Sequence, residues 1–303
     1  MHTAWYCAGR GIPIPLDELK GFLQPALRVI AAAVLCGPDA FRVRSQQSPW
    51  LPGERQYFIS PVYSFETFDQ FWFGKTKVDL KPDDSVQHTA YLNAEYGLLE
   101  NLALDLTAGY AWTESKAFNP THVAENDAGW IDTTFGLRYR FLDEHKSSSV
   151  FAPTLTLRAG GIIEGSYQPK YLFSAGAGAS GVEASLLFGK IIGQTGLAIF
   201  GDLGYRHRGE HVPDNFFSRI GVSETTLNFL TINVSYRHTQ GLSGGDIGAV
   251  PFPQSKQNAE QIEAGIGCTD KAGRSLQMFV AQTIDGRNVA EKSIVGVSVS
   301  FPF

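Results

Sequence analysis

Charged residues recur through the apolar and small-residue stretches of the chain, and they are the strongest candidates for chemistry. In a functional interpretation, such residues line a polar pathway and determine which solutes can pass. In a structural interpretation, the same charges pair with one another inside a narrow interior, because buried charges need partners. We favour the structural interpretation for any single residue. The set consists of Glu95, Asp105, Asp132, Arg138, Arg140, Arg158, Glu183, Asp202, Arg206, Arg208, Arg237 and Glu263.

The other reactive residue types lack the spacing that metal, redox or phosphate chemistry needs. Cys7, Cys36 and Cys268 form no C-x-x-C pair that would indicate a metal or redox site. The glycine-rich stretches at 160–161 and 244–246 lack the strand-to-helix context of a phosphate-binding loop. We therefore expect no catalytic residue, no metal and no cofactor.

Alternation of apolar and polar residues, with a period of two, dominates the chain from residue 55 onward. It is clearest over 88–112, where even positions carry mainly Leu, Ala, Tyr and Trp, and odd positions carry Thr, Asn, Glu, Asp and Gly. With a turn at 100–101, this stretch predicts two antiparallel strands, each with one apolar and one polar face. The pattern returns over 131–141, 151–159, 182–189, 197–208, 230–237, 261–268 and 295–303.

The residues on the polar face distinguish a soluble sheet from a membrane barrel. A soluble sheet exposes a face rich in Lys and Glu, whereas this face carries Gly, Ser, Thr and Ala with scattered charges and almost no Lys. Small residues suit a crowded concave interior, and the apolar face then suits lipid. We therefore predict an all-β, antiparallel, up-and-down transmembrane β-barrel. In this barrel Leu104 faces lipid and Thr107 faces the lumen.

The connections between the expected strands alternate in length, as they do on the two sides of an outer membrane. Short turns near 98–101, 142–149, 192–196, 225–228 and 270–274 alternate with long polar loops near 113–128, 160–178, 208–216, 240–257 and 285–292. With both ends of the barrel in the periplasm, the count is about twelve strands, or about fourteen if residues 70–80 form two more. Arg206, Arg208 and Arg237 then lie near the long-loop mouth, where they could attract anions.

Composition is consistent with this class of protein. The 303-residue chain is 43% hydrophobic and 18% charged, below the ~25% charged residues of an ordinary soluble domain. It also lacks the ~18 consecutive apolar residues of a membrane helix. A net charge of -5 and a pI near 5.8 argue against a nucleic-acid partner.

Residues 1–50 differ in character from the rest of the chain. Lys20 and Arg28 precede a short apolar run at 29–36, which is typical of a signal peptide. We therefore predict a leader over residues 1–50 that is removed and a barrel over residues 51–303. A soluble N-terminal extension is the alternative.

Two features resemble known outer-membrane proteins. Val299, Phe301 and Phe303 share one face of the last strand, which resembles the C-terminal assembly signal of bacterial outer-membrane proteins. Segments 94–98 (AEYGL), 135–140 (FGLRYR) and 202–208 (DLGYRHR) resemble the barrel family linked to the MetA pathway of phenol degradation. That resemblance implies a transporter-like barrel in the bacterial outer membrane for small molecules, aromatic or other hydrophobic compounds among them. We expect a monomer that contacts lipid, lipopolysaccharide and the outer-membrane assembly machinery.

A lipid-modifying barrel enzyme is the competing interpretation, and a purely structural surface barrel is the third. Outer-membrane phospholipases and lipid A deacylases carry a His-x-Ser-Asn pattern facing lipid, and residues 236–241 (YRHTQG) look similar. Here the hydroxyl belongs to Thr239, directly after His238 and therefore on the opposite face of the strand. The two side chains could not share a proton as nucleophilic catalysis requires. We expect His238 and the comparable His207 to lie at the membrane rim, and we predict that the protein is not an enzyme.

Overall fold

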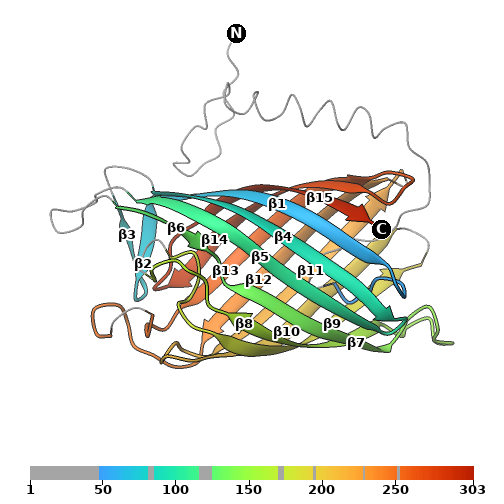
Figure 1. Cartoon of the computed structure of the whole chain (residues 1–303), viewed down its shortest axis with the longest axis horizontal. Helices are drawn as coiled ribbons and strands as arrows, with labels where there is room; N and C mark the ends of the chain where they lie inside the picture. Colours follow the sequence, from blue (N-terminus) through green and yellow to red (C-terminus); the bar gives the residue numbers. More distant parts are fainter. Residues whose placement is uncertain are drawn as a thin grey trace, which may run out of the picture.

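The computed structural model describes residues 48–80, 85–115, 125–169, 174–193, 196–227, 229–250 and 253–303. These residues form an antiparallel β-sheet that closes on itself, with the strands tilted relative to the barrel axis (Figure 1). Among them, no helix has the length and apolar character that a membrane crossing needs.

The strands follow one another around the wall in nearly sequential order. They are β1 (Tyr57–Phe68), β2 (Gln70–Phe73), β3 (Thr76–Asp79), β4 (Ser85–Leu99), β5 (Leu102–Ser115), β6 (Glu125–Trp130), β7 (Thr133–Leu142), β8 (Thr154–Ile163), β9 (Gly181–Ile192), β10 (Leu197–Arg208), β11 (Asn215–Thr226), β12 (Leu230–Gly241), β13 (Asn258–Thr269), β14 (Ser275–Arg287) and β15 (Ser293–Pro302). From β7 to β15 each strand pairs with its neighbours in sequence, and β15 pairs with β1. The pairings of β4 with both β1 and β5 complete the ring.

The barrel has 12 strands, as the loop pattern predicted. β6 and β7 count as one of them, because β6 pairs with β5 from Tyr110 to Ser115 and β7 pairs with β5 from Leu102 to Thr107. The alternative of fourteen strands is wrong. Residues 70–80 do form two strands, but β2 and β3 have four residues each and form a separate two-stranded sheet, which meets the β14–β15 loop in one isolated bridge between Phe71 and Ala290. A membrane-spanning strand needs ~9–11 residues, so this hairpin cannot join the wall.

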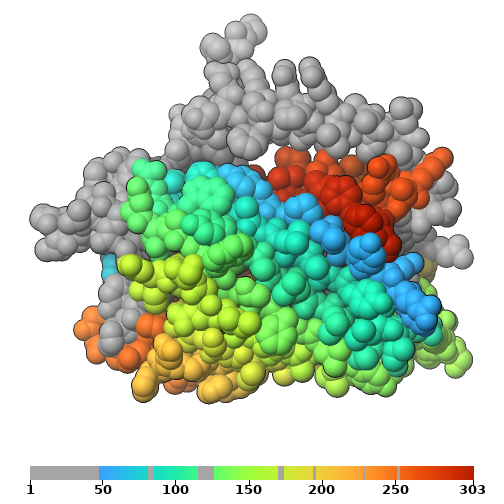
Figure 2. Space-filling model, in the orientation of Figure 1, coloured from blue at the N-terminus to red at the C-terminus, as the bar shows by residue number. Residues whose placement is uncertain are grey.

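The two faces of the wall are oriented as the alternation predicted. On β5, the side chains of Leu104 and Leu106 are 42% and 40% exposed, whereas Ala103 and Asp105 are 0% and 3% exposed. The same contrast holds around the ring, where large apolar side chains such as Leu137, Leu203 and Ile232 point outward. Figure 2 shows that side chains of β1, β4 and β5 close the wall on one face of the barrel. The outer surface is therefore an apolar band, as a lipid-facing surface must be.

The connections alternate between the two ends of the barrel. Tight turns join β4 to β5, β9 to β10, β11 to β12 and β13 to β14 at one end, where the longer β7–β8 connection also lies. The β8–β9, β10–β11, β12–β13 and β14–β15 connections lie at the other end. β1 begins and β15 ends at the tight-turn end, on the right in Figure 1. The Tyr57 and Phe303 rings stack there with centroids 4.9 Å apart, while Tyr110 and Trp130 meet toward the long-loop end at 5.8 Å. We call these the inner and outer ends.

The β2–β3 hairpin packs at the outer end. Phe68, Phe71 and Leu80 form a small apolar cluster with Ala290 of the β14–β15 loop. This cluster holds the hairpin against two long loops, since Ile247 of the β12–β13 loop also packs against it. The hairpin therefore belongs to the outer mouth rather than to the wall.

Candidate functional site in the barrel lumen

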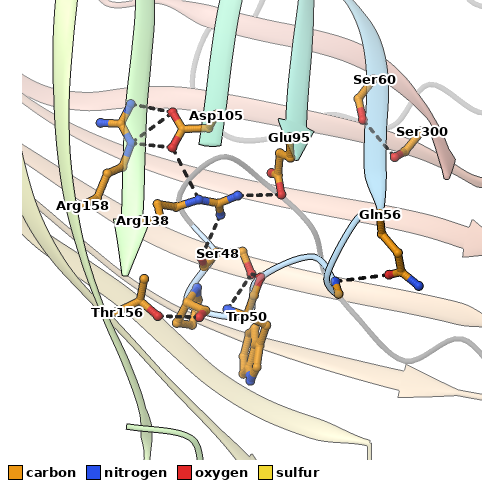
Figure 3. Close-up of polar contacts among 12 residues, drawn as sticks. Ser48, Trp50, Gln56, Ser60, Glu95, Asp105, Arg138, Thr156, Arg158 and Ser300 are labelled. Carbon is orange, nitrogen blue, oxygen red and sulfur yellow. Dashed lines mark hydrogen bonds and ion pairs between the residues drawn. The ribbon is translucent and has the colours of Figure 1, made fainter. Parts of the chain in front are cut away.

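One side of the lumen is crossed by a continuous chain of ion pairs. Arg138 Nη2 lies 2.8 Å from Glu95 Oε2, and Arg138 Nε lies 3.4 Å from Asp105 Oδ2. Arg158 Nη2 lies 2.7 Å from Asp105 Oδ1, and Arg158 also pairs with Glu183. Figure 3 shows Glu95, Arg138, Asp105 and Arg158 in this order. The series of ion pairs continues from Glu183 to Arg206 on β10, and we call it the ionic ladder.

The ladder satisfies charges that the lumen would otherwise leave unpaired. The Arg138 side chain is 0% exposed, and Asp105, Arg158 and Glu183 are also buried. Burying a charge without a partner is costly, whereas a hydrogen-bonded pair offsets much of that cost. This geometry supports the structural interpretation for the ladder residues.

Two further ion pairs continue the ionic side. Arg219 Nε lies 3.0 Å from Asp202 Oδ2, and Arg208 Nη1 lies 2.6 Å from Asp132 Oδ2. Tyr167, from the loop after β8, donates a hydrogen bond to Asp132. Burial and this hydrogen bond raise the pKa of Tyr167, so the hydroxyl keeps its proton and remains a donor. The predicted cationic rim at Arg206 and Arg208 is thus neutralised by direct partners.

Arg140 lies at the inner end, away from the ladder. Its guanidinium lies 3.1 Å from Asp143 and donates a hydrogen bond to the carbonyl of Glu100. These contacts tie the β7–β8 connection to the β4–β5 turn. Arg140 therefore fastens two inner turns together.

The opposite side of the lumen, from β12 round to β15, is mostly uncharged. Asn233, Ser235 and Thr283 are buried there, and a Cβ added at Gly265 would meet the amides of Asn233 and Gln277. We call this side the neutral wall. It carries Arg237 on β12 and Glu263 on β13, and among the described residues neither has an ion-pair partner within 4.0 Å.

The residues just before β1 enter the lumen at the inner end, and sequence reasoning missed them. Arg138 Nη1 donates to the Ser48 carbonyl at 3.2 Å, and Thr156 Oγ1 donates to the Pro49 carbonyl at 2.7 Å (Figure 3). Trp50 Nε1 donates to Glu144 Oε1 at 2.9 Å. We call residues 48–51 the inner segment, and all of it is buried. The leader predicted over residues 1–50 stays a prediction, since residues 1–47 lie outside the described residues.

Small residues in the wall make room for the inner segment. A Cβ added at Gly189 on β9 would lie 2.6 Å from Pro49 and 2.7 Å from Trp50. Trp50 also packs with Ala198 and Phe200 of β10. The segment thus occupies a fitted position across the inner end.

Sequence reasoning also missed Arg219, Glu144 and Tyr167. Arg219 has the parity of a lumen residue, but the adjacent Phe216 and Phe217 obscure the alternation on β11. Glu144 and Tyr167 lie in connections, where no period assigns a face. Only their contacts identify them as part of the lumen.

The predicted assembly residues lie at the seam of the barrel. Val299, Phe301 and Phe303 alternate along β15 and just past its end, and Phe301 and Phe303 are exposed outward. Backbone hydrogen bonds of 2.9 Å and 3.1 Å join Phe303 to Tyr57, the first residue of β1. The last residue therefore helps to close the ring.

The two histidines lie at the outer end of the wall. His207 Nδ1 lies 2.7 Å from Asp214 Oδ1, and His238 Nδ1 lies 3.8 Å from Glu260 Oε1. Hydrogen bonding from Tyr205 holds the pKa of Asp214 below its usual value, which keeps that carboxylate charged beside His207. Thr239 lines a lumen pocket, on the other face of β12 from His238. Ser218 is the register partner of His238, but within the described part of the chain no hydrogen bond joins their side chains.

No protein-family model and no curated protein matches this chain. Among solved structures, an outer membrane channel from Pseudomonas putida F1 is similar, with a TM-score of 0.68 at 12% identity, covering 86% of this chain and 100% of that one. The chain has the fold of an outer-membrane β-barrel. Two other outer-membrane barrels are less similar. The translocator domain of the autotransporter NalP from Neisseria meningitidis has a TM-score of 0.47 at 10% identity, covering 95% of this chain and 97% of that one. The P. putida toluene transporter TodX has a TM-score of 0.41 at 9% identity, covering 88% of this chain and 95% of that one.

Proposed function

We propose that this barrel is an outer-membrane channel through which small polar or ionic solutes diffuse. The apolar outer band supports a location in the bacterial outer membrane. Lipid contains no water that could form hydrogen bonds with polar groups on the outer surface of the barrel. The seam between Tyr57 and Phe303 supports assembly of a single chain into a complete ring.

The division of the lumen into an ionic ladder and a neutral wall is the observation that carries this proposal. A lumen serving only as a packed core would be expected to pair all its charges, yet Arg237 and Glu263 have no ion pair among the described residues. The hydroxyl and amide groups of the neutral wall can exchange hydrogen bonds with a passing solute without breaking an ion pair. The ladder then acts as a rigid support for the opposite side of the pathway.

The inner segment supports passage of small solutes rather than large ones. Residues 48–51 lie within the lumen beside Arg138 and Thr156, where they take up space at the inner end. Permeant size is therefore limited by the gap between this segment and the neutral wall.

The polar lumen narrows the expectation drawn from the MetA-pathway resemblance. A hydrocarbon forms no hydrogen bonds or ion pairs with the charged and amide groups of the lumen, whereas an aromatic compound with a polar or ionised group can form them. We therefore favour polar or ionised aromatic compounds over pure hydrocarbons within that family's range of compounds.

Swelling of proteoliposomes in isotonic solute tests the proposal. We expect liposomes that contain the folded protein to swell in small solutes, with rates that fall steeply as solute size increases. Liposomes with heat-denatured protein provide the control. Equal rates for folded and denatured protein would show that the lumen is structural and not a pathway.

A further inference from the structure

A pocket of about 350 Å³ lies inside the outer end of the lumen, against the neutral wall. Its floor is formed by β12, β13 and β14, and its cover comes from Phe71 of the hairpin and from residues of the long loops. The volume lies at the small end of the ~300–1,000 Å³ range of ligand pockets. A solute arriving from the long-loop side would meet this pocket first.

Arg237 is the distinctive residue of the pocket. Each other arginine in the described part of the chain has a carboxylate within 4.0 Å, but Arg237 has none and donates no hydrogen bond there. A guanidinium carries five donors in a planar fork that fits a carboxylate. Arg237 is therefore available for an anion from outside the protein.

The other charges that line the pocket do not compete for this anion or for Arg237. Lys292 Nζ lies 2.9 Å from Glu66 Oε2, so these two residues neutralise each other. The pocket thus keeps a net positive charge at Arg237, in a lumen where fields are screened less than in bulk water.

The lining of the pocket has one polar and one apolar side. Arg237 and Gln261 are register partners on β12 and β13, and Thr239 follows Arg237 on the same face. Phe71, Val289, Ala290 and Ile294 line the pocket from the hairpin, the β14–β15 loop and β15. This arrangement fits a small molecule with an ionised end and an apolar body.

We propose that this pocket binds small aromatic monocarboxylates, with the carboxylate held by Arg237 and the ring against the apolar side. The inference rests on the proposed function in that it gives the channel an outer subsite for one class of permeant. Hydrogen bonds from Thr239 and Gln261 complete the polar side.

Calorimetric titration of the detergent-solubilised full chain with benzoate tests the site, with benzyl alcohol as the uncharged probe. We expect saturable benzoate binding and at least tenfold weaker benzyl alcohol binding. Arg237→Gln should weaken benzoate binding by about 10- to 100-fold, because hydrogen bonds to a charged group are stronger than those between neutral groups. Arg274→Gln removes the same charge at an exposed inner turn and should leave binding unchanged.

A second variant keeps the test decisive if Arg237→Gln does not fold. Ala259→Trp places a large ring on the pocket floor and should abolish benzoate binding while Arg237 is kept. Absence of saturable benzoate binding by the unmodified chain, equal binding of benzyl alcohol, or full binding by a folded Arg237→Gln or Ala259→Trp variant would overturn the site. Binding in detergent requires no open pathway, so a protein that binds benzoate but fails the swelling assay refutes the channel and keeps the site.

Discussion

Arg158 on β8 and Asp105 on β5 form an ion pair of 2.7 Å across the strand that separates them. The intervening strand, β7, offers Gly136 at the crossing point. A Cβ added at Gly136 would lie 2.8 Å from Arg158 Nη2, so a side chain at this position would displace the guanidinium. The absence of a side chain at Gly136 thus leaves room for the guanidinium to reach Asp105.

Gly136→Val should therefore destabilise the barrel by displacing Arg158 from Asp105. We expect a loss of about 1–3 kcal/mol in the free energy of unfolding, because a buried carboxylate loses a charged partner. Urea unfolding in lipid bilayers, followed by tryptophan fluorescence, measures this loss. Gly209→Ala is the control, since within the described residues a Cβ there meets only the Ser180 carbonyl oxygen, at 3.7 Å. Equal stability of the two variants would show that Gly136 is not needed for the ladder.

The orientation of β5 predicts opposite outcomes for two arginine substitutions on the same strand. Leu104→Arg places a cation on the lipid-facing side, where the cost near the middle of the membrane is ~2–4 kcal/mol. Thr107 faces the lumen, where its hydroxyl donates to Asn93 Oδ1 at 2.7 Å, and Thr107→Arg should be tolerated better. Folding yield into vesicles, read from heat-modifiable mobility on gels, compares them. A higher yield for Leu104→Arg would reverse the assignment of faces.

Closure of the seam should depend on the final aromatic residue. Removal of residues 301–303 deletes the stacking of Phe303 on Tyr57 and two backbone hydrogen bonds between β15 and β1. We expect the shortened chain to accumulate in the periplasm or to be degraded, as fractionation and immunoblotting would show. Phe151→Ala changes an aromatic residue that is 91% exposed in an inner connection and should assemble normally. Normal heat-modifiable barrel from the shortened chain would contradict this role.

The outer loop between β12 and β13 should stay anchored under mildly acidic conditions. Arg287 Nε and Nη2 each donate to Asp246 at 2.8 Å, and the Arg287 and Asn288 hydrogen bonds hold the pKa of Asp246 below its usual value. Because the folded-state pKa is lowered, the anchor is fully present above the ordinary aspartate range and is lost only as pH falls through the lowered pKa. A ¹³C NMR titration of the Asp246 carboxyl measures the midpoint. Arg287→Gln should raise it, and an unchanged midpoint would exclude the anchor.

Most of the strands and their faces could be predicted from the sequence, because a period of two assigns a side to each residue in a strand. Leu104 and Asp105 lie as that period requires. Alternation alone does not decide whether residues 70–80 belong to the wall of the barrel; the length of the strands decides it. Gly74 has a φ of +58° and turns the chain after only four residues of β2, too early for a crossing.

The partners of the charged residues could not be predicted, because alternation gives the side of a residue but not the stagger between strands. The triplet Tyr-Arg-His occurs at 205–207 and at 236–238. Arg206 meets Glu183 on the neighbouring strand, whereas Arg237 has Gln261 as its register partner. The same motif therefore contains an arginine paired with a carboxylate in one strand and an arginine without an ion-pair partner among the described residues in the other.

Single-channel recording in planar bilayers tests the central claim, that the lumen conducts and that the inner segment narrows it. We predict discrete conductance steps for the unmodified chain and larger steps for Trp50→Ala, which removes the ring packed against Ala198 and Phe200. Trp130→Ala, at an outward-facing tryptophan that is 58% exposed, should keep the original step size. An absence of steps from all three folded proteins, or equal steps from the unmodified chain and Trp50→Ala, would contradict the account.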